Sequence, residues 1–315
     1  MTGERRTAKG GTFPSRRGEP PPMAYFDPAR PAAGTRSVGI AFDALRLRLT
    51  GLDDALADAL VARYGPYVEA PPAADAAALV VRFAREARDY FIEPPSEAEF
   101  NPVWLACDGS RVRFLGYRLA GWFDVDDVRG EILLAQGTYE PELRALENYI
   151  RCAVAWRAAA IGGALVHAAS AVRNGKAYLF YGESGAGKST LSAVNTRGRV
   201  VGDDLALLLP RPGGGLDLVG HPFGGPSDAG EPLAGRFPLV AGFRIVKAAA
   251  AEVRPVPRAL GFGQLVGNLT FVAEAFSERP DLFASIEAAF AGVPLFHLHF
   301  KKDDSYWDAI ETAGL

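Results

Sequence analysis

The stretch Gly182–Thr190 constrains the fold of this chain more than any other segment. It reads Gly-Glu-Ser-Gly-Ala-Gly-Lys-Ser-Thr and fits the pattern G-x-x-x-x-G-K-[ST]. Glycines permit the tight turns in which backbone N–H groups converge on phosphate oxygens. We therefore predict a phosphate-binding loop in which Lys188 bridges the β- and γ-phosphates of a nucleotide and Ser189 binds Mg²⁺. The residues expected to bind the nucleotide are Gly182, Glu183, Ser184, Gly185, Ala186, Gly187, Lys188, Ser189 and Thr190.

The segments on either side of this loop predict a strand before it and a helix after it. Ala164–Val172 and Ala177–Tyr181 are apolar, β-like runs, and the Asn174-Gly175 pair between them predicts a type I′ hairpin. After the loop, residues 190–196 are compatible with a short helix that has Gly198 as its C-cap. The alternative interpretation, a flexible glycine turn with an unrelated lysine, does not require this strand–loop–helix context.

A pair of carboxylates follows the next β-like run. Arg199–Gly202 reads as a strand and ends at Asp203-Asp204. A carboxylate at a strand end beside a phosphate loop can hold Mg²⁺ or the attacking group. Because adjacent side chains of a strand point to opposite faces, we expect one to serve the reaction and the other the structure. The alternative is an acidic turn that closes a hairpin, since Leu205–Leu209 resumes the β-like pattern.

Together these features resemble the catalytic domain of HPr kinase/phosphorylase and its relatives. That family has a histidine at the start of a strand, a hairpin, the phosphate loop, a short helix and a strand that ends in Asp-Asp. Here His167 precedes Gly182 by fifteen residues, and Asp203-Asp204 is the acidic pair. The resemblance covers Val166–Leu209 closely and residues 138–315 more loosely.

The resemblance implies an ATP- and Mg²⁺-dependent kinase that transfers the γ-phosphoryl group to a serine-type hydroxyl of a protein or peptide. Asp204 matches the general base of the family, and Asp203 matches its neighbour, close to phosphate and metal. His167 matches the active-site histidine near the transferred phosphate. Lys188, from the loop motif, completes the expected catalytic residues. In-line transfer of this kind relies on positioning and charge neutralisation. Self-association is also an expectation that comes from the resemblance.

The sequence departs from the bifunctional members of that family in one place. Their Glu-x-Arg-Gly signature is missing, and Gly220–Gly224 occupies the comparable position. This departure argues against a reverse phosphorylase activity and against HPr as the substrate. Two alternatives therefore stay open: a nucleotide-binding regulatory module without phosphoryl transfer, and a small-molecule kinase. The Pro- and Gly-rich stretch Gly220–Gly235 predicts a mobile loop beside the site.

Composition excludes several other classes of protein. The formal net charge of −3 provides no overall basic field, so we expect no nucleic-acid partner. No apolar run reaches the roughly 18 residues that a membrane helix needs, so we expect no membrane partner. The two cysteines, Cys107 and Cys152, are too few for a disulfide framework, and their spacing fits no metal motif. These features are typical of a cytoplasmic protein.

We expect three parts along the chain. Residues 1–36 are rich in Pro and Gly and predict a disordered tail. Residues 37–137 predict an α+β region of unknown role, including a helix over Asp53–Tyr64. A long helix over residues 140–160 then opens a P-loop kinase-like domain over residues 138–315. Its expected class is α/β, a mixed sheet with flanking helices as in the C-terminal domain of HPr kinase.

Other polar groups are better explained by ordinary structural roles. Asp124, Asp126 and Asp127 lack the loop glycine and bidentate partner of a cation site, so we predict a solvated turn. His297 and His299 share one face of a strand, but no third metal ligand stands at a useful spacing. The remaining basic candidates, of which at most one is expected to bind phosphate or substrate, are Lys247, Arg254 and Arg258.

Overall fold

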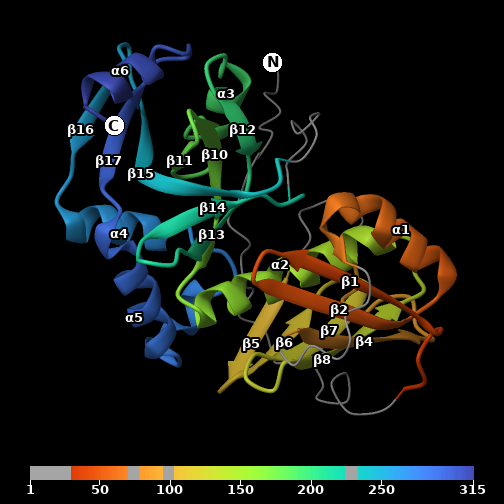
Figure 1. The fold of residues 1–315 in the computed structure, drawn as a ribbon. Helices are drawn as coiled ribbons and strands as arrows, with labels where there is room; N and C mark the ends of the chain where they lie inside the picture. Colours follow the sequence, from red (N-terminus) through yellow and green to blue (C-terminus); the bar gives the residue numbers. More distant parts are fainter. Residues whose placement is uncertain (1–29, 70–77, 95–102, 224–232) are drawn as a thin grey trace, which may run out of the picture.

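Two mixed β-sheets with helices packed against them make up the fold (Figure 1). The computed structural model describes residues 30–69, 78–94, 103–223 and 233–315. The arrangement confirms the predicted α/β class. Within these described ranges, no helix is long and apolar enough to cross a membrane. The helices are α1 (Asp54–Tyr64), α2 (Glu142–Ala160), α3 (Lys188–Ala193), α4 (Arg258–Val266), α5 (Pro280–Ala289) and α6 (Tyr306–Thr312), with 3₁₀ turns η2 (Gly65–Tyr67), η3 (Ala273–Ser277) and η4 (Phe290–Gly292).

The first sheet is formed by the N-terminal strands in the order β3-β1-β2-β4-β8-β7-β6-β5. The pairs β2–β4 and β4–β8 are parallel, and the other neighbours are antiparallel. Leu45, Leu47 and Leu49 alternate with polar residues along β2 and turn into the core, as period-two patterning requires. The strands are β1 (Arg36–Phe42), β2 (Leu45–Leu52), β3 (Val68–Glu69), β4 (Leu79–Glu86), β5 (Trp104–Asp108), β6 (Arg111–Leu115), β7 (Leu119–Asp124) and β8 (Arg129–Ala135).

The predicted tail is shorter at its C-terminal end than the composition indicates. Residues 1–29 lie outside the described residues. Residues 30–36, in contrast, lie against the first sheet: Ala32 forms a β-bridge with Ala84, and Arg30 forms an ion pair with Glu86. Gly34 also donates a backbone hydrogen bond to Gly51 over 2.9 Å. These pairings with β2 and β4 give the segment a defined structure, although its composition predicts disorder.

The acidic turn after β7 is more ordered than expected. Asp124 is only 6% exposed, and its carboxylate accepts hydrogen bonds from the backbone N–H groups of Asp126 and Asp127. Burial raises the pKa of Asp124, but these backbone donors, together with the Ser110 side chain and the charge of Arg111, lower the pKa overall. Asp124 therefore closes the turn between β7 and β8, while Asp126 and Asp127 are exposed in that turn as predicted.

Helix α1 shows how local sequence sets an element boundary. The side chain of Asp53 accepts a hydrogen bond from the Leu56 N–H over 3.0 Å and caps the helix, which begins where the sequence predicts. Leu56 and Leu60 then pack into the core.

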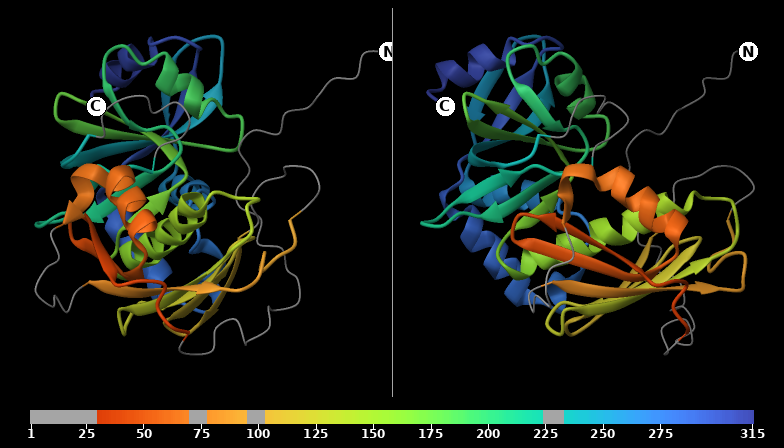
Figure 2. Two further views of the ribbon diagram at one scale, coloured as in Figure 1. Left: turned by 90° about the vertical axis from the view of Figure 1, so that its right-hand side faces the viewer. Right: turned by 45° about the vertical axis from the view of Figure 1, so that its right-hand side comes forward.

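Helix α2 packs against both halves of the chain. Tyr149 contacts Phe114 and Phe123 of the first sheet, with ring centroids 5.8 and 5.7 Å away. Further along the same helix, Trp156 Nε1 donates a hydrogen bond to the Phe271 carbonyl of the C-terminal half over 3.0 Å. Figure 2 shows α2 between the first sheet and the C-terminal half, and one core cluster contains residues of both. Helix α2, which the sequence predicts to open the second domain, therefore packs against both halves of the chain.

The second sheet carries the predicted phosphate loop. Its strands run in the order β12-β10-β11-β15-β14-β13-β9, and β17 pairs with β15 and with β16. The pairs β11–β15 and β15–β17 are parallel. The strands are β9 (Ala164–Val166), β10 (Ala168–Arg173), β11 (Lys176–Tyr181), β12 (Arg199–Gly202), β13 (Ala206–Pro210), β14 (Leu216–Val219), β15 (Arg236–Lys247), β16 (Glu252–Pro255) and β17 (Leu295–Phe300).

The hairpin before the loop is confirmed, and two neighbouring predictions are wrong in detail. Asn174 and Gly175 both have positive φ, 51° and 73°, between the antiparallel strands β10 and β11. The predicted strand Ala164–Val172 is interrupted, because β9 pairs with β13 whereas β10 pairs with β11 and β12. Helix α3 ends with Val194 as its C-cap, and Gly198 instead donates its N–H to the Asn195 side chain.

Candidate functional site

The predicted phosphate loop joins the end of β11 to the start of α3. Tyr181 is the last residue of the strand, and Lys188 is the first of the helix. Gly187 has a φ of 116°, a conformation that residues with a Cβ rarely adopt, and its carbonyl accepts the first helical hydrogen bond from Leu191 over 2.8 Å. A turn inside the loop is closed by Ala186 N–H donating to the Glu183 carbonyl over 3.0 Å.

Lys188 turns its ammonium group back onto this loop. The Nζ atom donates to the Gly182 carbonyl over 2.7 Å and to the Glu183 carbonyl over 3.4 Å, and the residue is only 8% exposed. Burial lowers the pKa of Lys188, and the charge of Asp204 partly opposes that shift. An ammonium carries three N–H donors, so one remains for a bound phosphate after these two carbonyls are satisfied.

The other loop positions lie toward solvent. Glu183, Ser184, Gly185 and Ser189 are exposed, and Ala186 and Thr190 are partly buried. The Glu183 carboxylate accepts a hydrogen bond from Arg244 of β15 over 2.9 Å. Sequence reasoning missed this arginine, because only the parallel pairing of β11 with β15 places it beside the loop.

His167 occupies the break between β9 and β10, where its side chain meets Asp204. The distance from His167 Nδ1 to Asp204 Oδ1 is 3.7 Å. Burial and the charge of Lys188 lower the pKa of His167, whereas the charge of Asp204 acts to raise it. The imidazole is therefore neutral at pH 7. Backbone bonds fix the neighbourhood, with His167 N–H on the Asn268 carbonyl and Ala168 N–H on the Asp204 carbonyl, at 2.7 and 3.0 Å.

The two carboxylates of the acidic pair have different surroundings. Asp203 is 4% exposed, whereas the Asp204 side chain is 43% exposed. The alternative of a turn that closes a hairpin is wrong, because β12 pairs with β10 while β13 pairs with β9 and β14. Asp204 is thus the carboxylate available to an incoming group, beside His167 and within the field of Lys188.

The ammonium, hydroxyl and carboxylate groups present have the donor chemistry that a nucleotide with its metal ion requires. Mg²⁺ in such sites is usually held by one or two protein ligands together with the phosphates. Ser189, exposed in the first turn of α3, and Asp203 are the candidates that the sequence names. Across the part of the chain that the structure describes, no group of three or more His, Cys, Asp or Glu residues forms a metal cage.

The weaker candidates have structural partners. His297 Nε2 lies 2.9 Å from the Gln264 side chain of α4. Arg254 pairs with Glu252 of its own strand over 2.7 Å, and Arg258 donates to the Ala291 carbonyl over 2.8 Å. His299 and Lys247 lie toward the C-terminal ends of β17 and β15. Among the described residues, no hydrogen bond or ion pair joins this group to Lys188 or Asp204. Both cysteines are free thiols, as expected.

The chain matches no protein-family model and no curated protein. The resemblance of Val166–Leu209 to HPr kinase/phosphorylase therefore stays an expectation.

Proposed function

We propose that this protein is an ATP- and Mg²⁺-dependent kinase of the HPr-kinase-like group that phosphorylates a serine-type hydroxyl of a protein or peptide. The observation that carries the proposal is the contact of Asp204 with neutral His167, 3.7 Å apart, beside the lysine of a G-x-x-x-x-G-K-S loop. A base beside the transferred phosphoryl group assists transfer to a hydroxyl, and Asp204 is the partly exposed carboxylate in the field of Lys188.

In this proposal each residue acts on a defined atom. The loop amides and Lys188 hold the triphosphate and neutralise charge on the γ-phosphoryl group. Asp204 accepts the proton of the attacking hydroxyl while the new O–P bond forms and the bond to the β-phosphate oxygen breaks, which releases ADP. His167 lies beside the Asp204 carboxylate and limits the directions in which it can point. Ser189, with Asp203 as the second candidate ligand, would hold Mg²⁺, which would supply further neutralisation of the phosphates.

Transfer of label from γ-labelled ATP tests the proposal. The protein is incubated with Mg²⁺ and an extract of its source cell, as wild type and as Asp204→Asn. We expect a labelled protein or peptide with the wild type and a loss of at least about 100-fold with the variant. Asp108→Asn, which removes an exposed carboxylate of the first sheet, is the matched control and should retain transfer. Absence of any label that depends on Asp204 would rule the kinase out.

The absent Glu-x-Arg-Gly signature favours a second candidate, a nucleotide-binding regulatory module without transfer. Calorimetry separates the two. Tight ATP binding that Asp204→Asn leaves unchanged, with no product formed, would support the module. A small-molecule kinase would use the same residues, and its label would appear in the low-molecular-mass fraction of the extract instead of in a protein.

A further inference from the structure

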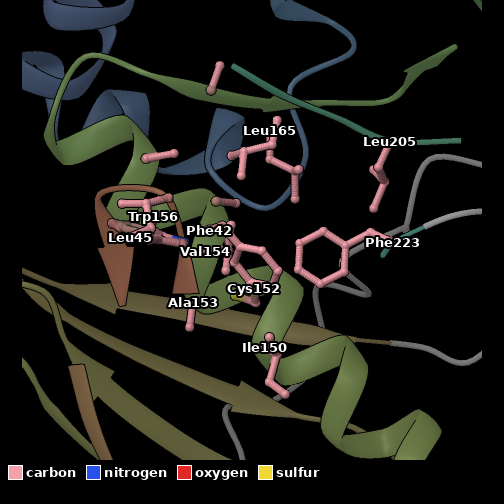
Figure 3. Packing of buried hydrophobic residues seen from close by; sticks show 14 of the residues in the cluster. Phe42, Leu45, Ile150, Cys152, Ala153, Val154, Trp156, Leu165, Leu205 and Phe223 are labelled. Atoms are coloured by element: carbon pink, nitrogen blue, oxygen red, sulfur yellow. The ribbon is translucent and has the colours of Figure 1, made fainter. Parts of the chain in front are cut away.

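The short segment Gly220–Phe223 is buried between the two halves of the molecule. Sequence composition predicts a mobile loop here. These four residues do form a loop without helix or strand, but it is buried instead of mobile, while residues 224–232 lie outside the described ranges. Phe223 is fully buried, with its ring centroid 5.0 Å from that of Phe42 in β1. Figure 3 shows the two rings side by side, with Leu205 above Phe223. A side chain of the C-terminal half thus completes the core of the N-terminal half.

Two helices hold this segment from the N-terminal side. Arg63 of α1 donates to the Pro222 carbonyl over 2.6 Å and to Glu147 of α2 over 2.8 Å. Arg151 of α2 donates to the same Glu147 over 3.1 Å, and its guanidinium lies 5.8 Å from the centroid of the Phe223 ring. Charged side chains of α1 and α2 therefore contact both the Pro222 carbonyl and the Phe223 ring.

On its other side the segment supports the acidic pair. His221 is 2% exposed, and a Cβ added to Gly202 would lie only 3.5 Å from His221 Cε1. The ring therefore rests against the backbone that immediately precedes Asp203 and Asp204. His221 Nδ1 accepts the N–H of Phe223 over 3.1 Å, which couples the ring to the anchored end of the segment.

We propose that Gly220–Phe223 is a latch through which helices α1 and α2 position Asp203 and Asp204, with His221 and Phe223 as positioning residues. For its catalytic consequence this inference rests on the proposed kinase function. Lys188 and the phosphate loop belong to β11 and α3, outside this chain of contacts. Releasing the latch therefore disturbs the carboxylates, while the loop and Lys188 keep their contacts with the triphosphate. This predicts a larger effect on kcat than on KM for ATP, to which only Asp203, through the metal, would contribute.

Arg63→Ala releases the latch, and Arg36→Ala is the matched control. Arg36 also makes two side-chain contacts, with Asp54 and Asp58 of α1, but they lie on the exposed surface. Amide hydrogen exchange of residues 199–209 is measured on the full chain, with residues 176–181 of β11 as the internal reference. We expect exchange in 199–209 to rise about tenfold in Arg63→Ala and Phe223→Leu, and not in Arg36→Ala. Arg63→Lys, which keeps a donor, should restore most of the protection.

Transfer kinetics on the same variants complete the test. We expect kcat to fall about tenfold in Arg63→Ala while KM for ATP stays within about twofold. Unchanged exchange in both Arg63→Ala and Phe223→Leu would overturn the latch, as would equal effects in Arg36→Ala. If no variant and no wild type transfers phosphate, yet exchange in 199–209 rises as expected, the kinase proposal fails and the latch stands.

Discussion

His167 and Asp204 meet at 3.7 Å although they come from different strand ends. β10 begins directly after His167 and pairs with β12, which ends directly before the acidic pair, so that Ser170 faces Gly202. The backbone bond from Ala168 to Asp204 strengthens this arrangement. Because strand pairing sets the positions, a change of either side chain tests the chemistry of the pair more than the fold.

We expect His167→Gln to lower phosphoryl transfer about tenfold at pH 7.5 and to flatten the acid side of the pH profile. Burial and Lys188 lower the pKa of His167, so the ring protonates only below its ordinary value of 6.5. Below that pH the positively charged ring attracts the Asp204 carboxylate, which then no longer accepts the proton of the attacking hydroxyl. The check is kcat between pH 5 and 8. If the variant keeps the wild-type acid limb, His167 does not control Asp204.

Lys188→Met should weaken ATP binding by about 10- to 100-fold, because a charge-assisted hydrogen bond to phosphate contributes roughly 1.5–3 kcal/mol. Lys176→Met removes an exposed lysine from the β10–β11 hairpin and serves as the control. Calorimetry with ATP and Mg²⁺ measures both affinities. Equal affinities in the two variants would show that the loop does not hold a triphosphate.

The backbone of the loop can be tested with a pair of glycine variants. Gly187 has φ 116°, so Gly187→Ala should cost about 1–3 kcal/mol of folding free energy or distort the loop and reduce nucleotide affinity. Gly263 lies inside α4 and a Cβ there would meet nothing within 4 Å, so Gly263→Ala should stabilise by about 0.5–1 kcal/mol. Urea denaturation and ATP titration measure the two effects. Loss of affinity in both variants would contradict a local role of Gly187.

Local signals in the sequence predicted those elements whose cause is local. Asp53 caps α1 through its own side chain, and Asn174-Gly175 forms its turn through its own backbone. The break at His167 could not be predicted in this way. The apolar run on both sides of it is continuous, and only the different partners of β9 and β10 divide it.

The same limit applies to contacts between the two halves. The apolar spacing of α2 predicted a helix correctly, but its periodicity did not reveal that Tyr149 and Trp156 pack against different halves of the chain. Likewise, Gly220 and Pro222 favour an exposed loop on local grounds, whereas the packing of Phe223 against Phe42 buries the segment. The clustering of Lys188, His167 and Asp204 agrees with the predicted grouping, and their catalytic roles remain predictions.

His221 should make folding stability depend on pH. Burial and the nearby charge of Arg151 lower its pKa to about 3 in the folded protein. The unfolded chain takes up this proton as the pH falls through about 6.5, and the folded protein does not until about pH 3. The contribution of neutral His221 to the free energy of unfolding is therefore complete above pH 6.5. It is lost progressively between pH 6.5 and 3, with ~2 kcal/mol lost by pH 5.

Urea denaturation of the wild type and His221→Gln at pH 8 and pH 5 measures this contribution. The variant removes the titrating ring but leaves an acceptor for the Phe223 N–H. We expect the wild type to be the more stable protein at pH 8 and the difference to shrink by ~2 kcal/mol at pH 5. The titrations of His167 and His297, whose pKa values burial also lowers, occur in both proteins and cancel in this difference. A difference that does not change with pH would mean that His221 is accessible to protons in the folded protein.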